Sequence, residues 1–220
     1  MLTVRPTECR LERISLAALP DFASLGSVER LFLTRTPIRD LSPLSGLGGL
    51  RVLGLRLTRV GDVTPLGGLS CLESLILSFT PVRDVAGLAG LRRLSSLYLT
   101  GCRVADVSPL AGLTGLQRLD LGGTLVSDLA PLAGLTELES LQLSSTAVTN
   151  LTPLAGLRKL RVLELGDTSV SDLSPLRGLT QLRRLDIRGT PAARDPGGLA
   201  LPGCEIVTAA TVRRRRVKPV

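Results

Sequence analysis

A block of 22 residues recurs without insertion or deletion along most of this 220-residue chain. The block at residues 113–134 reads LTGLQRLDLGGTLVSDLAPLAG, and its neighbours are near copies of it. Repetition at such a period predicts a solenoid, in which each unit packs only on the units beside it. One continuous domain is therefore expected, built from eight blocks that begin at Leu25, Leu47, Leu69, Leu91, Leu113, Leu135, Leu157 and Leu179.

Each block divides into two halves that predict different local structures. The first half contains the pattern LxxLxL, whose last two leucines alternate as one face of a short strand, and these strands are expected to stack in parallel. The second half, such as DLSPLSGL at residues 40–47, predicts a short 3₁₀ turn in which a Ser or Thr is the N-cap and Pro is the first helical residue.

A small polar residue follows each strand pattern by three positions. Buried at the turn, its side chain is expected to bond backbone groups that leave the sheet, so that successive blocks form a polar column inside the solenoid. The column consists of Thr36, Thr58, Thr80, Cys102, Thr124, Thr146, Thr168 and Thr190.

The combination of LxxLxLxx(T/C)xV with DLSPLxGL resembles the 22-residue leucine-rich repeat of the bacterial internalins and related proteins, over roughly residues 25–200. The general consensus of such repeats has Asn or Cys where this chain mostly has Thr, so Cys102 fits directly and the threonines are a departure. The resemblance implies an α/β solenoid, a leucine-rich repeat arc with a parallel β-sheet on its concave face and short 3₁₀ turns on its convex face. It also implies a role in binding a protein.

The two ends of the chain depart from the repeat, as expected for units that shield the apolar end faces of a solenoid. Extending the repeat register backwards places Cys9 and Leu11 inward, although LERISL at 11–16 is a competing candidate strand. A last degenerate strand is expected within CEIVTA at 204–209. The predicted organisation is an N-terminal cap at 1–24, eight repeats at 25–200, a C-terminal cap strand at 201–212 and a basic tail at 213–220.

The composition argues against catalysis and against metal binding. The chain contains no His, the commonest general base and a frequent metal ligand. Its four cysteines lie in different units without a CxxC motif, so neither a zinc site nor a disulfide framework is indicated. We therefore expect a protein that is not an enzyme and that has no cofactor, metal or small-molecule substrate.

The N-terminal segment gives an expectation about location. Charged residues interrupt it, so it lacks an apolar run of signal-peptide length, and no run of about 18 apolar residues that could span a membrane occurs. Because the cysteine pattern also indicates free thiols, a cytoplasmic location is expected.

Binding is expected on the concave face, where the residue between the last two leucines of each strand pattern points outward. This column is apolar or aromatic in its first half and polar or acidic in its second, which the repeat itself does not require. Exposed aromatic residues often anchor interfaces. With flanking positions included, the predicted protein-binding residues are Phe32, Arg56, Ile76, Phe79, Tyr98, Asp120, Gln142, Glu164, Arg184, Asp186 and Arg188.

Two alternatives to concave-face binding stay open. The formal net charge is +8, and the tail supplies five of these charges, which leaves +3 for the rest of the chain. The tail could therefore contact a nucleic acid or another acidic surface, through Arg213, Arg214, Arg215, Arg216 and Lys218. The chain could also be a sensor or structural part of a larger signalling assembly.

Overall fold

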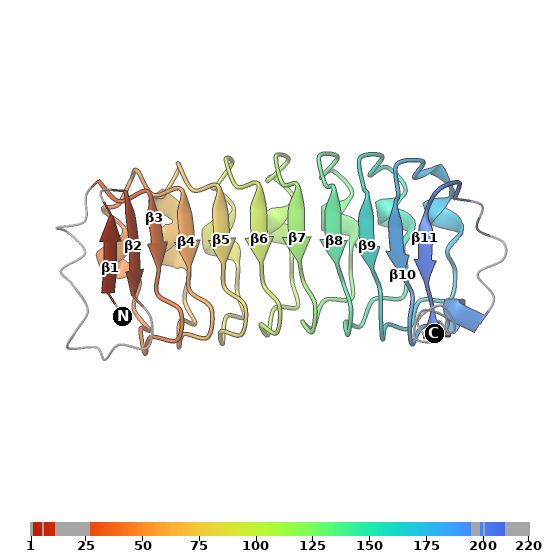
Figure 1. Cartoon of the computed structure of the whole chain (residues 1–220), viewed down its shortest axis with the longest axis horizontal. Helices are drawn as coiled ribbons and strands as arrows, with labels where there is room; N and C mark the ends of the chain where they lie inside the picture. The colour runs from red at the N-terminus through yellow and green to blue at the C-terminus, as the bar shows by residue number, and fades with distance from the viewer. Residues whose placement is uncertain (1, 6, 12–26, 195–198, 200, 210–220) are drawn as a thin grey trace, which may run out of the picture.

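The described residues form one open sheet of eleven short strands that follow each other in sequence order, shown in Figure 1. The computed structural model describes residues 2–5, 7–11, 27–194, 199 and 201–209. Its strands are β1 (Leu2–Arg5), β2 (Glu8–Leu11), β3 (Arg30–Phe32), β4 (Val52–Gly54), β5 (Ser74–Ile76), β6 (Ser96–Tyr98), β7 (Arg118–Asp120), β8 (Ser140–Gln142), β9 (Val162–Glu164), β10 (Arg184–Asp186) and β11 (Glu205–Val207).

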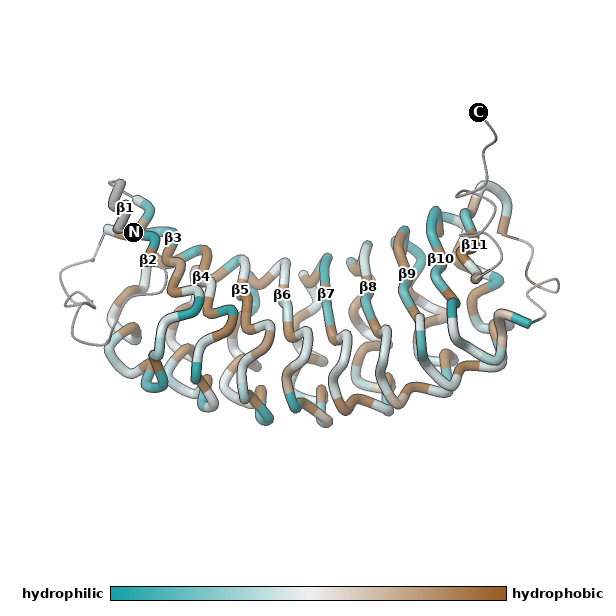
Figure 2. The backbone as a smooth tube through the Cα atoms, turned by 60° about the horizontal axis from the view of Figure 1, so that its bottom comes forward, coloured by the Kyte–Doolittle hydropathy of each residue, from teal (hydrophilic) through white to brown (hydrophobic). Residues whose placement is uncertain are grey.

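Strands β2 to β11 pair in parallel, which confirms the predicted solenoid. From β2 to β10 each residue pairs with the residue 22 positions away, so that Leu119 lies between Leu97 and Leu141. Figure 2 shows the chain as a shallow arc with the strands along its inner side. The sheet is therefore the floor of a long concave surface.

The N-terminal end contains a hairpin that the repeat does not predict. Strand β1 pairs antiparallel with β2, and β2 in turn pairs in parallel with β3 at the repeat spacing. Cys9 and Leu11 are fully buried in β2, as the backward extension of the register predicts. The competing segment LERISL lies, apart from its first residue, outside the described residues, as do the basic tail and Phe22.

The core is a stack of aliphatic layers. Each block contributes its repeated leucines and one valine or isoleucine, and in the block at 113–134 every one of them is at most 1% exposed. They are Leu113, Leu116, Leu119, Leu121, Val126, Leu129 and Leu132. Because these layers come from successive blocks, each block is stabilised by its two neighbours.

The threonine column satisfies the backbone as predicted. In the seven blocks that carry Thr at this position, the Thr hydroxyl donates a hydrogen bond of 2.6–2.7 Å to the carbonyl oxygen of the residue three positions earlier. Cys102 takes the same position, with its Sγ 3.4 Å from the Thr80 hydroxyl and 3.2 Å from the carbonyl oxygen of Leu77. Among the described residues, no buried side-chain nitrogen or oxygen lacks a hydrogen-bond partner.

The convex side carries 3₁₀ turns, but the prediction of Ser or Thr as their N-cap is wrong. The Ser or Thr is already the first residue of the turn, and the residue before it makes no side-chain capping bond. The turns are η3 (Ser42–Leu44), η4 (Thr64–Gly68), η5 (Ala86–Leu88), η6 (Ser108–Leu110), η7 (Ala130–Leu132), η8 (Thr152–Leu154), η9 (Ser174–Gly178) and η10 (Pro191–Arg194).

The side chain two positions before seven of these turns supplies the missing acceptor. In η3, for example, the first backbone N–H donates to Asp40 Oδ1 over 2.8 Å. Asn150 does the same for η8 at 2.9 Å, so a neutral amide oxygen can replace the carboxylate. The other members of this Asx column are Asp62, Asp84, Asp106, Asp128 and Asp172.

Acid should weaken the fold through this Asx column. Hydrogen bonds from the Ser or Thr hydroxyl and backbone N–H hold the pKa of Asp40 and Asp62 below the usual value, and the backbone bond is the larger cause for Asp106 and Asp172. A lowered folded-state pKa means a stabilising contribution that is complete above the unfolded pKa of about 3.9 and is lost as the pH falls through the folded value. Urea unfolding between about pH 7 and about pH 3 should show this loss.

A variant with Asn at these four positions should lose less stability on acidification, because amides do not titrate in this range. The natural Asn150 shows that the turn accepts the substitution. Some acid dependence should persist through other carboxylates. An unchanged pH profile in the fourfold variant would contradict this role of the Asx column.

Candidate protein-binding surface

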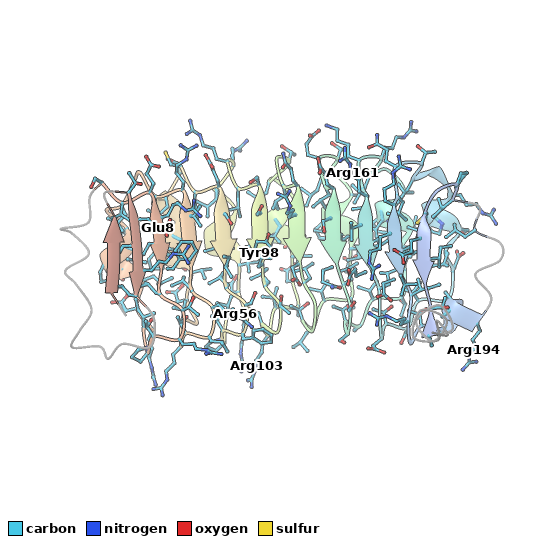
Figure 3. All side chains as sticks on the ribbon, in the orientation of Figure 1. Glu8, Arg56, Tyr98, Arg103, Arg161 and Arg194 are labelled. Carbon is cyan, nitrogen blue, oxygen red and sulfur yellow. The ribbon has the colours of Figure 1, made fainter. Side chains whose placement is uncertain are left out.

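The predicted concave column lies on the solvent-facing, concave face of the sheet, with one residue from each of the strands β3 to β10. Tyr98, labelled in Figure 3, is at the middle of this face, with Ile76 before it and Asp120 after it in the same register. All three side chains are partly exposed. The described part of the column therefore changes from apolar to polar at the centre of the arc.

The apolar half forms a shallow hollow of about 370 Å³. Phe32, Ile76 and Tyr98 line it, as the column predicts. The lining also includes residues that the sequence placed only on flanking outward positions or had not chosen as contacts, namely Arg30, Val52, Ser74 and Ser78. Their alternation with the buried leucines of the same strands was the available signal.

Phe32 lines this hollow, and its ring is in contact with two arginines. The Arg10 guanidinium lies 4.4 Å from the centre of its ring, and that of Arg30 lies 5.9 Å away, both within cation–π range. The ring also covers Gly54, where an added Cβ would lie 2.6 Å from Phe32 Cδ1. Phe32 is thus half-buried and fixed before any partner arrives.

Tyr98 also borders a second hollow, of about 270 Å³, which is more polar. Arg118, Asp120, Gln142 and Glu164 line it on the far side of the ring. Within the described chain, no side chain or backbone group is hydrogen-bonded to the Tyr98 hydroxyl. Tyr98 therefore lines both the apolar hollow and the polar one.

The polar half is held by hydrogen bonds both within and between repeats. Asp120 accepts a hydrogen bond from the Thr100 hydroxyl at 2.7 Å and one from the Gly122 N–H at 2.9 Å. Gln142 donates to Glu164 at 2.9 Å and accepts from the Ser144 N–H at 2.8 Å. These bonds fix the side chains in place, so little side-chain freedom remains to be lost on binding.

Asp186 has a different role from the one expected of a contact residue. It is only 1% exposed, and it accepts hydrogen bonds from the backbone N–H and the guanidinium of Arg188. Burial raises its pKa, but the bonds and charge of Arg188, with Arg184, outweigh that effect and leave the pKa below its usual value. The carboxylate orients Arg184 and Arg188 and is itself unavailable to a partner.

Arg184 joins this cluster to the neighbouring strands. Its guanidinium lies 3.7 Å from Glu164 and 3.2 Å from Glu205 of the last strand. Arg184 and Arg188 remain partly exposed, so of the predicted residues at this end they are the ones that can meet a partner.

Phe79 and Arg56 lie apart from the concave hollow. Phe79 follows the end of β5 with a positive φ of 60°, and the residue is 46% exposed. The Arg56 guanidinium lies 5.3 Å from the centre of that ring. The two residues belong to the edge of the sheet where the strands end, so the structure separates them from Ile76 and Tyr98.

The described residues offer neither a metal site nor a membrane-spanning helix. No group of three or more His, Cys, Asp or Glu side chains in the described ranges could hold a metal ion. Over the same ranges, no helix is both long and apolar enough to cross a membrane.

Comparison with known proteins identifies the repeat. The family described as leucine-rich repeats in two copies matches residues 92–134. The crystal structure of internalin C2 from Listeria monocytogenes is similar with 34% identity and a TM-score of 0.77, over 81% of this chain and 79% of that chain. A leucine-rich repeat protein of Leptospira interrogans has 25% identity and a TM-score of 0.75, over 86% of this chain and 51% of its own.

Internalin F of Listeria monocytogenes shares the fold at 22% identity and a TM-score of 0.57, over 92% of this chain and 86% of its own. Among curated protein sequences, none matches.

Proposed function

This chain belongs to the leucine-rich repeat proteins of the bacterial internalin type, and from that premise we propose that it is a non-enzymatic module that binds one protein partner on its concave face. The leucine-rich repeat fold commonly serves protein–protein interaction, because stacked repeats form an extended concave surface. A scaffold, an adaptor and a regulatory subunit all use such a surface.

The observation that carries the proposal is the pair of hollows that meet at Tyr98. One is lined by Phe32, Ile76 and Tyr98, and the other by polar side chains already held by hydrogen bonds. An apolar centre beside oriented polar groups is the usual composition of a protein interface. We infer that Ile76 and Tyr98 anchor the partner, and that Asp120, Glu164, Arg184 and Arg188 select it.

Catalysis has little support among the described residues. The carboxylates of Asp120 and Asp186 are each engaged by hydrogen-bond donors, and that of Glu164 by Gln142 and Arg184. A general acid or base must be able to exchange its proton with a bound substrate, whereas these oxygens already contact protein donors. We propose that these carboxylates shape the surface without reacting.

The test uses one variant for each part of the surface. A partner is first captured by cross-linking in the native bacterium and then purified for calorimetry. Tyr98→Ala should weaken its affinity by about 2 kcal/mol, or roughly 30-fold, if Tyr98 is a central anchor. Arg158→Ala, an exposed change away from the concave face, is the matched control and should leave the affinity unchanged.

Equal affinities for wild type and Tyr98→Ala would refute binding through the concave hollows. Phe79→Ala should be measured separately, because the structure places Phe79 outside those hollows. Circular dichroism of each variant shows whether the solenoid is intact.

We also propose that the protein works in the cytoplasm. All four cysteines are free, and burial raises the pKa of the Cys9 and Cys102 thiols, which keeps them protonated. Free thiols are typical of a reducing compartment. Fractionation of the native cell tests the location, and recovery of the protein in the medium or on the cell surface would refute it.

A further inference from the structure

A second surface lies along the edge of the sheet where the strands end, called here the strand-end edge. In the described part of the chain, all three large hydrophobic side chains that are exposed lie on it: Leu57 at 37%, Phe79 at 46% and Leu125 at 62%. Leu57 and Phe79 hold the same position in successive repeats, both with positive φ. Exposed apolar groups collected on one edge are a feature of interaction surfaces.

Arginines surround Leu57 and Phe79 in the first four repeats. Figure 3 shows Arg56 and Arg103 on this edge, opposite Arg161. Six exposed arginines occupy it, and none makes an ion pair with a described acidic side chain. They are Arg35, Arg39, Arg56, Arg59, Arg83 and Arg103.

The arrangement is specific to this part of the molecule. On the opposite edge, two cations contact an acidic side chain of the adjacent repeat, as in Arg51–Glu73 and Lys159–Glu137, both at 2.6 Å. Exposed arginines there that make no described ion pair, such as Arg92 and Arg161, have no exposed large hydrophobic residue on the described part of their edge. Further along the strand-end edge itself, the corresponding positions are mostly neutral. The unpaired positive charge therefore coincides with the exposed Leu57 and Phe79.

A hollow of about 290 Å³ lies beside Phe79 on this edge. Phe79 lines one side of it. Gly101 and Gly123 occupy the position of Phe79 in the next two repeats, and because they have no side chain they leave the space open. Asp120 lines the side toward the concave face. A partner's carboxylate would be repelled there, so its acidic residues should lie toward the arginines.

We propose that the strand-end edge binds an extended acidic segment of a partner protein that carries a bulky apolar side chain. The acidic residues pair with Arg56, Arg59 and Arg103, and the apolar side chain fills the hollow beside Phe79. From the repeat of Leu57 to that of Leu125 there are three spacings of about 4.8 Å, which an extended segment covers with roughly five residues. The segment thus needs no fold of its own.

A protein segment fits this edge better than a nucleic acid does. Single-stranded nucleic acids bind to basic grooves with several aromatic side chains for base stacking, and Phe79 is the one aromatic residue on the described strand-end edge.

The test measures fluorescence anisotropy of the full chain with a labelled peptide of roughly eight residues, acidic except for one central Phe. Wild type should bind it, with an affinity that falls as salt is raised. The triple variant Arg56→Glu, Arg59→Glu, Arg103→Glu should bind at least about tenfold more weakly. Replacing the Phe of the peptide by Ala should also weaken its binding to the wild-type protein. The Ala peptide should still bind wild type at least as tightly as the Phe peptide binds the Phe79→Ala variant.

Matched controls separate this edge from the net charge, the tail and the concave face. The variant Arg92→Glu, Arg158→Glu, Arg161→Glu makes the same charge change on the opposite edge. It should keep its affinity within about twofold, because salt screens exposed charges that lie more than a Debye length away. Replacing Arg213 to Arg216 by Gln, or Tyr98 by Ala, should also leave peptide binding intact.

Three results would overturn the proposal. They are no binding of the peptide by wild type, an equal loss in the control variant or the tail variant, and tighter binding of a single-stranded oligonucleotide of the same charge. The last result would assign the edge to nucleic acid.

Discussion

Replacing Leu119 by Ala is expected to lower the free energy of unfolding by about 2–5 kcal/mol, because it leaves a cavity in the middle of the leucine stack. Leu119 is 1% exposed and lies in β7 between Leu97 and Leu141 of the adjacent strands. Since each repeat contacts only its neighbours, a cavity at this place weakens the coupling of both halves of the solenoid. Urea unfolding followed by circular dichroism measures the loss.

Leu125→Ala is the matched control in the same repeat. Leu125 is 62% exposed, so the same substitution there should change the free energy by no more than about 0.5 kcal/mol. A broadened transition in Leu119→Ala alone would show that the two halves no longer unfold together. Equal stabilities of the two variants would contradict the assignment of Leu119 to the core.

The sequence was sufficient to predict the solenoid because one register repeats without interruption. A residue that is inward in one block must be inward in all, so the alternation of Leu119 and Leu121 around Asp120 located every strand from β3 to β10. The threonine column followed from the same register. Its hydrogen bonds to the preceding carbonyls explain why Thr can take the place of the consensus Asn or Cys.

Features without a repeating counterpart could not be predicted. Strand β1 exists because the first parallel strand has an open edge, and nothing in the 22-residue pattern indicates an antiparallel hairpin there. The capping role of the Asx column was missed because Ser or Thr before Pro is the commoner N-cap signal. Here the turn is so short that its first backbone N–H finds its acceptor on the side chain two residues before the turn begins.

The concave column was predicted residue by residue, but the state of each side chain was not. Sequence position alone cannot show that Asp186 is buried under Arg188, since that depends on the reach of two long side chains across the sheet. Nor can it show that the positive φ at Phe79 directs the ring to the strand-end edge. Ile76 and Tyr98 remain the candidate anchors, and their role in binding stays a prediction.

Gly87→Ala is expected to destabilise the protein by about 1–3 kcal/mol, and Gly87→Pro by at least as much, because the site has no room for a Cβ. Gly87 stands in η5 where most other repeats have Pro, so the repeat pattern alone favours proline at this position. In the structure an added Cβ would lie 2.6 Å from Thr64 Cα and 2.8 Å from the Val63 carbonyl oxygen. These are backbone atoms of the preceding turn, which cannot rotate away as a side chain could.

Gly90→Ala in the same repeat is the control for this prediction. Its added Cβ would meet only the Gly67 carbonyl oxygen at 3.8 Å, an ordinary contact. That variant should be neutral, or more stable by up to about 1 kcal/mol because Ala has less freedom than Gly in the unfolded chain. Thermal and urea unfolding of the variants decide the matter, and a Gly87→Pro protein as stable as wild type would mean that η4 and η5 can move apart at little cost.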